Sequence, residues 1–156
     1  MNVRKKEKLS KEIVNAFYSD PPPLLSDDAA SYKDYFDDTF IFWGKDWHEL
    51  KLQYFENNPT VFSSLPSDIL PYFLGAYMYL SVKEEDFSCS ALVNVCENPI
   101  LARNKKYRRR PKMQIIREAL SDKQIKVFTK YLSLRKEYVD PGEESTLDYS
   151  ARLLEK

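Results

Sequence analysis

The chain has 156 residues, of which 43% are apolar and 14% aromatic, enough for the core of one folded domain. Its 24 basic and 24 acidic residues cancel, which argues against a chain drawn to nucleic acid by overall charge. Only three glycines are present, which argues against a glycine-rich phosphate loop and against a sheet built from many tight turns.

The charges are unevenly distributed along the chain. Residues 20–97 carry fourteen acidic and four basic side chains, net −10, whereas residues 98–139 carry thirteen basic and three acidic side chains, net +10. The densest run is RNKKYRRRPK, 103–112, in which seven of ten residues are Arg or Lys. The chain therefore has one acidic and one basic candidate surface.

The N-terminal residues predict an amphipathic helix over about 5–19, because Leu9, Ile13 and Phe17 recur at helical spacing. The prolines of DPPP, 20–23, end it. No apolar stretch of the kind found in a signal peptide follows the charged N-terminus. Together with two cysteines expected to be reduced, this predicts a cytoplasmic protein.

The acidic stretch after the prolines predicts two further helices. Ser26 is the expected cap of the first, and its apolar stripe consists of Ala29, Tyr32, Tyr35 and Phe36. Asp46 is the expected cap of the second, in which the apolar face consists of Trp47, Leu50, Tyr54 and Phe55. The sequence NNP, 57–59, ends the second helix.

The segment 65–82 is apolar on nearly every side of a helix, which is typical of a helix at the centre of a domain. We expect this helix over 67–82, with Ser67 as its cap and Pro71 in its first turn. It is too short to span a membrane, and Asp68 and the prolines also argue against a membrane span.

Three helices are predicted in the C-terminal half. One runs from Ser88 to about residue 97. The next has a capping-box pattern at Ser121 and Gln124, and the last begins at Ser145. The fold class expected is all-α: a single globular domain, 1–156, of about six or seven helices around the central helix 67–82, with a basic loop at 103–112.

Catalytic and metal-binding patterns are weak. His48 is the only histidine, and the two cysteines do not have the spacing of a zinc site. Asp34 and Asp38 are four residues apart and share a helix face, so an enzyme using them with His48 is the third hypothesis. We expect a protein that is not an enzyme, with no cofactor and no metal.

The basic run allows two interpretations. Its cations suit phosphates, and Tyr107 within it suits base stacking. Residues 20–97 carry a negative charge of the same size as the positive charge of residues 98–139. This balance favours instead a basic surface that faces carboxylates of the chain itself or of a partner. If the run binds nucleic acid, charge reversal at Arg108, Arg109 and Arg110 abolishes that binding.

Three stretches in order, FWGKDWHEL (42–50), SSLPSDILPYFLGAYMYLSV (63–82) and LSDKQIKVFTKYL (120–132), resemble a family of small bacterial helical proteins of unassigned function. The shared pattern is Trp-x-x-Leu, then Tyr-Phe-Leu-x-Ala-Tyr, then a helix containing Gln, and Gly75 stands in place of the family's proline. The resemblance implies a helical domain and supplies no catalytic residues.

In size and style the chain is also similar, by class analogy alone, to immunity proteins that neutralise bacterial toxins. Many such toxins are basic nucleases, and an acidic surface attracts them by electrostatic steering. We therefore expect a non-enzymatic protein that binds a cognate toxin; the alternative is a nucleic-acid-associated accessory protein using the loop 103–112. A homodimer stays open, and no membrane contact is expected. The predicted partner-binding residues are Asp27, Asp28, Asp34, Asp37, Asp38, Asp46 and Glu49, with Arg108, Arg109 and Arg110 as a second contact.

Overall fold

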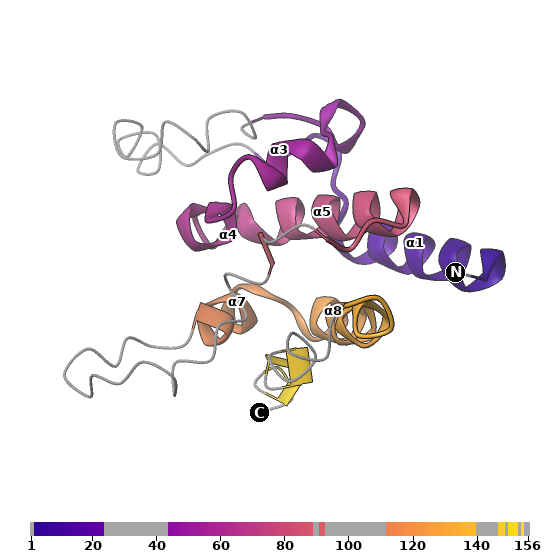
Figure 1. Ribbon diagram of the computed structural model, residues 1–156. Coiled ribbons are helices and arrows are strands. Elements are labelled where there is room, and N and C mark those ends of the chain that lie inside the picture. The colour runs from indigo at the N-terminus through magenta and orange to yellow at the C-terminus, as the bar shows by residue number, and fades with distance from the viewer. Residues whose placement is uncertain are drawn as a thin grey trace.

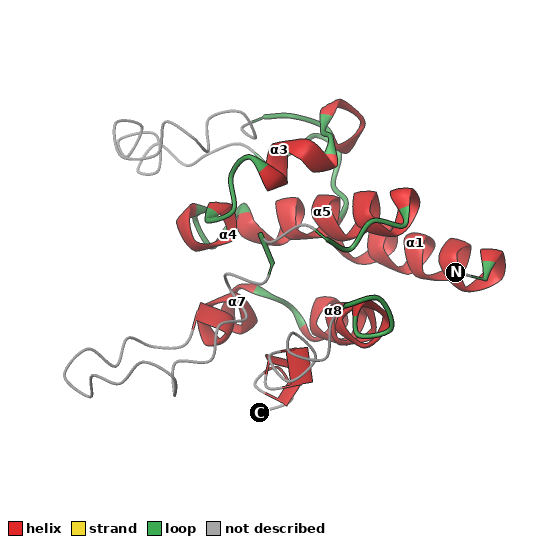
Figure 2. Cartoon of the chain, in the orientation of Figure 1, coloured by secondary structure: helices red, strands yellow, loops and turns green. Residues whose placement is uncertain are grey.

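The computed structural model describes residues 2–23, 44–88, 91–92, 112–139, 147–148, 150–152 and 154. These residues form helices and the loops between them, with no strand among them (Figure 2). Buried side chains from every described helix belong to one hydrophobic core, which runs from Leu9 to Leu154. The all-α class predicted for the chain is therefore confirmed.

Helix α1 spans Val3–Phe17, close to the predicted range of 5–19. The Asn2 side chain caps it by accepting a hydrogen bond from the backbone N–H of Arg4 at 2.9 Å. The apolar stripe of Leu9, Ile13 and Phe17 is buried, and α1 packs against α5 and α8. The helix ends one residue before Tyr18, whose backbone is extended, and this sets the direction in which the chain leaves the helix.

The prediction of one continuous helix after Asp46 is wrong, because the structure has two short helices there. A short 3-10 helix, η3, spans Trp47–Glu49, Leu50 is extended, and helix α3 then spans Leu52–Glu56. In one continuous helix, residues two apart would point in nearly opposite directions. The extended Leu50 between the two helices allows both Leu50 and Leu52 to be buried.

Helix α5, Leu70–Glu84, lies at the centre of the fold, between α3 and α7 (Figure 1). This confirms the predicted central helix and moves its start from residue 67 to 70. Ser67 is not the cap, because residues 67–69 form a turn and the N-cap is Ile69. Pro71 does lie in the first turn, where its missing N–H costs no helical hydrogen bond. A four-residue helix, α4 (Val61–Ser64), precedes the turn and was not predicted.

In the C-terminal half, helix α7 (Lys112–Ala119) was not predicted, whereas α8 (Asp122–Arg135) begins at the predicted capping box. The backbone N–H of Ser121 donates to Gln124 Oε1 at 2.9 Å. The described positions of 147–154 are helical, with Leu147 and Leu154 buried as predicted. Of the helix predicted at 88–97, the structure describes only residues 88, 91 and 92, and residues 91–92 form a turn; the rest of it lies outside the described residues.

Buried polar contacts connect α5 with α8. Arg135, at the last turn of α8, is fully buried, and its Nη1 donates to Tyr77 Oη at 2.6 Å. The hydroxyls of Ser81 and Tyr131 are 2.8 Å apart. Burial raises the pKa of Tyr131, so this hydroxyl stays protonated inside the core.

Candidate partner-binding site

Of the ten predicted partner-binding residues, the structure describes two, Asp46 and Glu49. The other eight lie outside the described residues: Asp27, Asp28, Asp34, Asp37, Asp38, Arg108, Arg109 and Arg110. We use the name acidic segment for residues 27–38, which carry the first five of these aspartates. The described structure on either side of the acidic segment gives the geometry of the candidate site.

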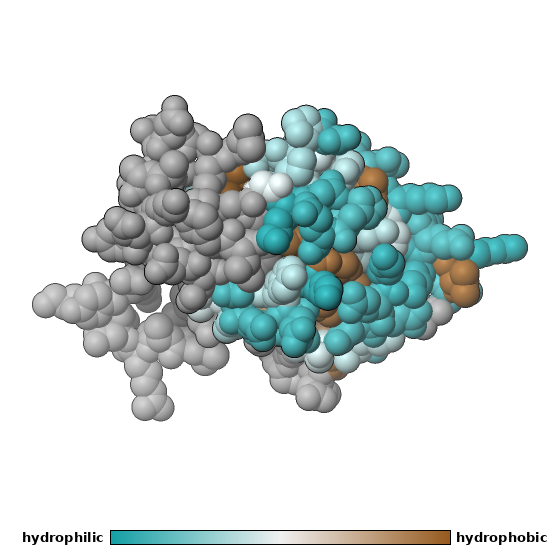
Figure 3. Space-filling view, turned by 90° about the horizontal axis from the view of Figure 1, so that it is seen from above, coloured by the Kyte–Doolittle hydropathy of each residue, from teal (hydrophilic) through white to brown (hydrophobic). Residues whose placement is uncertain are grey.

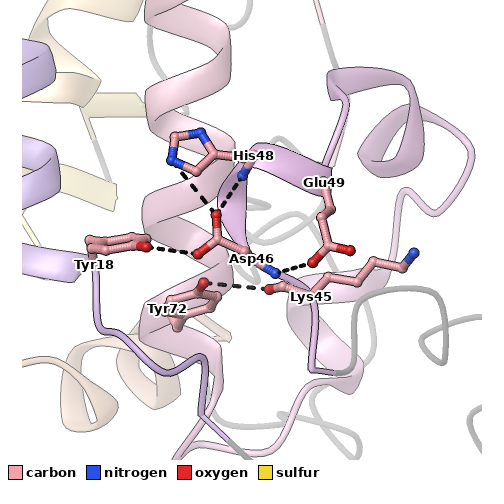
Figure 4. A network of polar contacts seen from close by, with 6 residues as sticks. All are labelled: Tyr18, Lys45, Asp46, His48, Glu49 and Tyr72. Atoms are coloured by element: carbon pink, nitrogen blue, oxygen red, sulfur yellow. Dashed lines mark hydrogen bonds and ion pairs between the residues drawn. The ribbon is translucent and has the colours of Figure 1, made fainter.

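Asp46 connects the C-terminal side of the acidic segment to the end of α1. Its Oδ2 accepts a hydrogen bond from Tyr18 Oη at 2.7 Å, and its Oδ1 accepts one from the backbone N–H of His48 at 2.8 Å (Figure 4). The backbone N–H of Asp46 donates to Glu49 Oε2 at 2.8 Å, which completes a capping box for η3. The predicted cap is therefore confirmed, and both carboxylates have intramolecular partners.

Aromatic side chains pack around this contact. The rings of Tyr18 and Trp47 meet edge to face with centroids 5.3 Å apart, and Trp47 is 5.7 Å from the ring of Tyr72. Trp47 Nε1 donates to the backbone carbonyl of Tyr72 at 3.2 Å, and the Tyr72 hydroxyl donates to the carbonyl of Lys45 at 3.4 Å. We call Tyr18, Lys45, Asp46, Trp47 and Tyr72 the anchor.

The pKa shifts of Asp46 and Tyr18 agree with the hydrogen bonds of the anchor. The hydrogen bond from the His48 backbone N–H, and after it the one from Tyr18, lower the pKa of Asp46 despite its partial burial. The same bond to Asp46 raises the pKa of Tyr18, and burial raises that of Tyr72. Near neutral pH the anchor therefore consists of a carboxylate that accepts and phenols that donate.

The anchor brings together two points of the chain 28 residues apart, Tyr18 and Asp46. The residues between them include the acidic segment, which lies outside the described residues. The contact between Tyr18 and Asp46 therefore brings the two ends of this stretch of chain together. Closing a loop in advance lowers the conformational entropy that remains to be lost when the loop binds a partner.

Of the three residues in the enzyme hypothesis, the structure describes only His48. The His48 side chain is 83% exposed, and its Nε2 is 3.8 Å from Asp46 Oδ1, on a carboxylate already used as a cap. Asp34 and Asp38, its partners in the enzyme hypothesis, lie outside the described residues. Across the described part of the chain, no group of three or more His, Cys, Asp or Glu side chains is placed to hold a metal.

Two anchor residues, Tyr18 and Tyr72, were missed by the sequence analysis. Tyr18 follows the last apolar position of α1, and Tyr72 lies in the most apolar helix, so each looks like an ordinary core residue. Their polar partners, Asp46 and Lys45, are 28 and 27 residues away. No local spacing connects such pairs, so only covariation between related sequences would have found them.

Comparison with protein-family models, with curated protein sequences and with solved structures finds no match. The resemblance to a small bacterial helical family therefore stays a prediction. Within the described ranges, no helix is at once long and apolar enough to cross a membrane.

Proposed function

We propose that the chain is a non-enzymatic cytoplasmic protein that binds and neutralises a cognate bacterial toxin, with the acidic segment as its main contact. The observation that carries the proposal is the anchor, which closes the acidic segment at its base through Tyr18 and Asp46. A segment with five aspartates, joined at its two ends through the anchor, suits rapid association with a basic protein.

The anchor also changes the assignment of residues within the site. The Asp46 carboxylate accepts hydrogen bonds from Tyr18 and from the backbone N–H of His48, and the Glu49 carboxylate accepts one from the backbone N–H of Asp46. We therefore assign them to holding the segment, and we assign toxin contact to the five aspartates of the acidic segment. Arg108, Arg109 and Arg110 keep their proposed part as a second contact.

The test uses growth rescue and affinity. The chain is expressed together with the product of the neighbouring gene, and complex formation is measured by pull-down and by titration calorimetry. We expect rescue of growth by the wild type and a loss of affinity of about tenfold or more for the triple variant Asp34→Asn, Asp37→Asn, Asp38→Asn. The affinity of this variant should also depend less on salt concentration.

A matched control removes the same charge from elsewhere on the body. Glu56, Asp68 and Glu84 are exposed, so the variant Glu56→Gln, Asp68→Asn, Glu84→Gln also adds three positive units to the net charge. We expect this control to bind like the wild type. Equal losses in the two variants would show that net charge alone matters, and the absence of both complex and rescue would contradict the toxin proposal.

A further inference from the structure

A groove of about 560 Å³ runs along the surface between α1 and α5, and none of its lining residues belongs to the anchor. Its lining on α1 extends from Val3 to Asn15, twelve residue steps, or about 18 Å of helix. On the other side it is lined by Tyr79, Lys83 and Glu85. The groove is therefore long, and it follows the helix axis.

The floor of the groove is apolar and partly exposed. Val14 and Tyr79 pack against the hydrophobic core from the outside, and Val3 at the end of the groove is 67% exposed. Seen from above, the described surface is mostly hydrophilic, with a few hydrophobic residues visible between hydrophilic ones (Figure 3). An apolar floor between two helices is the surface on which a third helix packs.

The rim of the groove carries cations in excess. Lys6 is paired with Glu85 at 2.9 Å, and this contact lowers the pKa of Glu85. Lys83 Nζ lies 5.8 Å from the centroid of the Tyr79 ring, over the floor. Lys11 is exposed and makes no ion pair within the described part of the chain. Among the lining residues, the three lysines Lys6, Lys11 and Lys83 outnumber the two glutamates, Glu7 and Glu85.

We propose that this groove binds an acidic amphipathic helix of a partner protein. The apolar face of that helix packs on Val14 and Tyr79, and its flanking carboxylates pair with Lys11 and Lys83. A helix of about twelve residues matches the length of the groove. This second surface has the opposite charge preference to the acidic segment, so it does not depend on a toxin being the partner of that segment.

The test is a selection from a library of displayed helical peptides with randomised surface positions. We expect peptides enriched on the wild-type protein to contain more Asp and Glu than the unselected library, together with an apolar stripe. Synthetic copies of the enriched peptides should bind about tenfold more weakly to the variant Lys11→Gln, Lys83→Gln. Their binding to the wild type should also weaken as salt concentration rises.

The control variant Lys51→Gln, Lys126→Gln removes two exposed lysines that do not line the groove. We expect it to bind the enriched peptides like the wild type. The salt titration, which uses the wild-type protein alone, tests the same charges even where a variant folds poorly. Three outcomes would overturn the proposal: no enrichment, enrichment without acidic residues, or equal weakening in both lysine variants.

Discussion

Asp46 is the residue on which the anchor depends, because its carboxylate serves two elements at once. One oxygen caps η3 through the backbone N–H of His48, and the other accepts from Tyr18 at the end of α1. Both bonds favour the charged form, which is why the pKa of Asp46 lies below its ordinary value. The contact between Tyr18 and Asp46 is therefore strongest when the Asp46 carboxylate is charged.

This connection predicts a pH dependence. Since the folded-state pKa of Asp46 is lowered, its contribution to stability is fully present above the unfolded value of about 3.9. It is lost as the pH falls through the folded value. Asn keeps the cap without the charge, so the free energy of unfolding of Asp46→Asn should fall less steeply than that of the wild type below about pH 4.

Urea unfolding at a series of acidic pH values measures this difference. Asp68→Asn is the control, because Asp68 is an exposed carboxylate that is not part of the anchor. We expect the control to follow the wild-type curve. Parallel curves for Asp46→Asn and the wild type would mean that the Tyr18 and His48 contacts do not hold the carboxylate in its charged form.

At the scale of elements, the features predicted correctly are those encoded by neighbouring residues. The capping boxes at Asp46 and Ser121 depend on residues three positions apart, and both are confirmed. The apolar stripe of α1 is likewise local. The start of α5 was misplaced because Ser67 is a good cap in isolation, whereas in the fold residues 67–69 turn and the helix begins without a side-chain cap.

What could not be predicted depends on contacts between distant elements. Arg135 is a charged residue in the last turn of α8, yet it is buried, and its bond to Tyr77 joins residues 58 apart. The break at Leu50 results from burying side chains on both sides of it, which a helical periodicity does not reveal. For the candidate site, the sequence identified the cap at Asp46, and the two tyrosines that anchor it appeared only in the fold.

The packing of α1 on α5 requires Gly75. A Cβ atom there would clash with Phe17 Cβ and would lie 2.8 Å both from Phe17 Cγ and from Trp47 Cζ2. Gly75→Ala should therefore push α1 and η3 away from α5, and we expect a loss of about 1–3 kcal/mol or more in the free energy of unfolding. Since Trp47 belongs to the anchor, the same change should also loosen the base of the acidic segment.

Chemical denaturation followed by tryptophan fluorescence measures the Gly75→Ala effect. Gly44→Ala is the comparison: no atom lies within 4 Å of its added Cβ, but its φ of +66° is unfavourable for alanine. We expect Gly44→Ala to cost less, about 1 kcal/mol. A larger cost at Gly44 than at Gly75 would contradict close packing between α1 and α5.

At the scale of the whole molecule, the neutral net charge is the sum of an acidic part, residues 20–97, and a basic part, residues 98–139. An approaching partner contacts one of these two parts first. Beyond a Debye length of about 10 Å at 0.1 M salt, the fields of the two parts are screened and largely cancel. The effect of charge substitutions in the basic run therefore separates the two functional hypotheses. The informative variant is Arg108→Glu, Arg109→Glu, Arg110→Glu.

If the run is a second contact with a toxin, this variant should speed dissociation of the complex by about tenfold, the sum of three modest charge contacts. Under the nucleic-acid alternative, the variant should instead lose its retention on heparin, a polyanion that stands in for the phosphate backbone. Surface plasmon resonance with the toxin and elution from a heparin column measure the two effects. Loss of heparin retention together with an unchanged toxin complex would favour the nucleic-acid hypothesis, since only phosphate binding requires these three cations as a group.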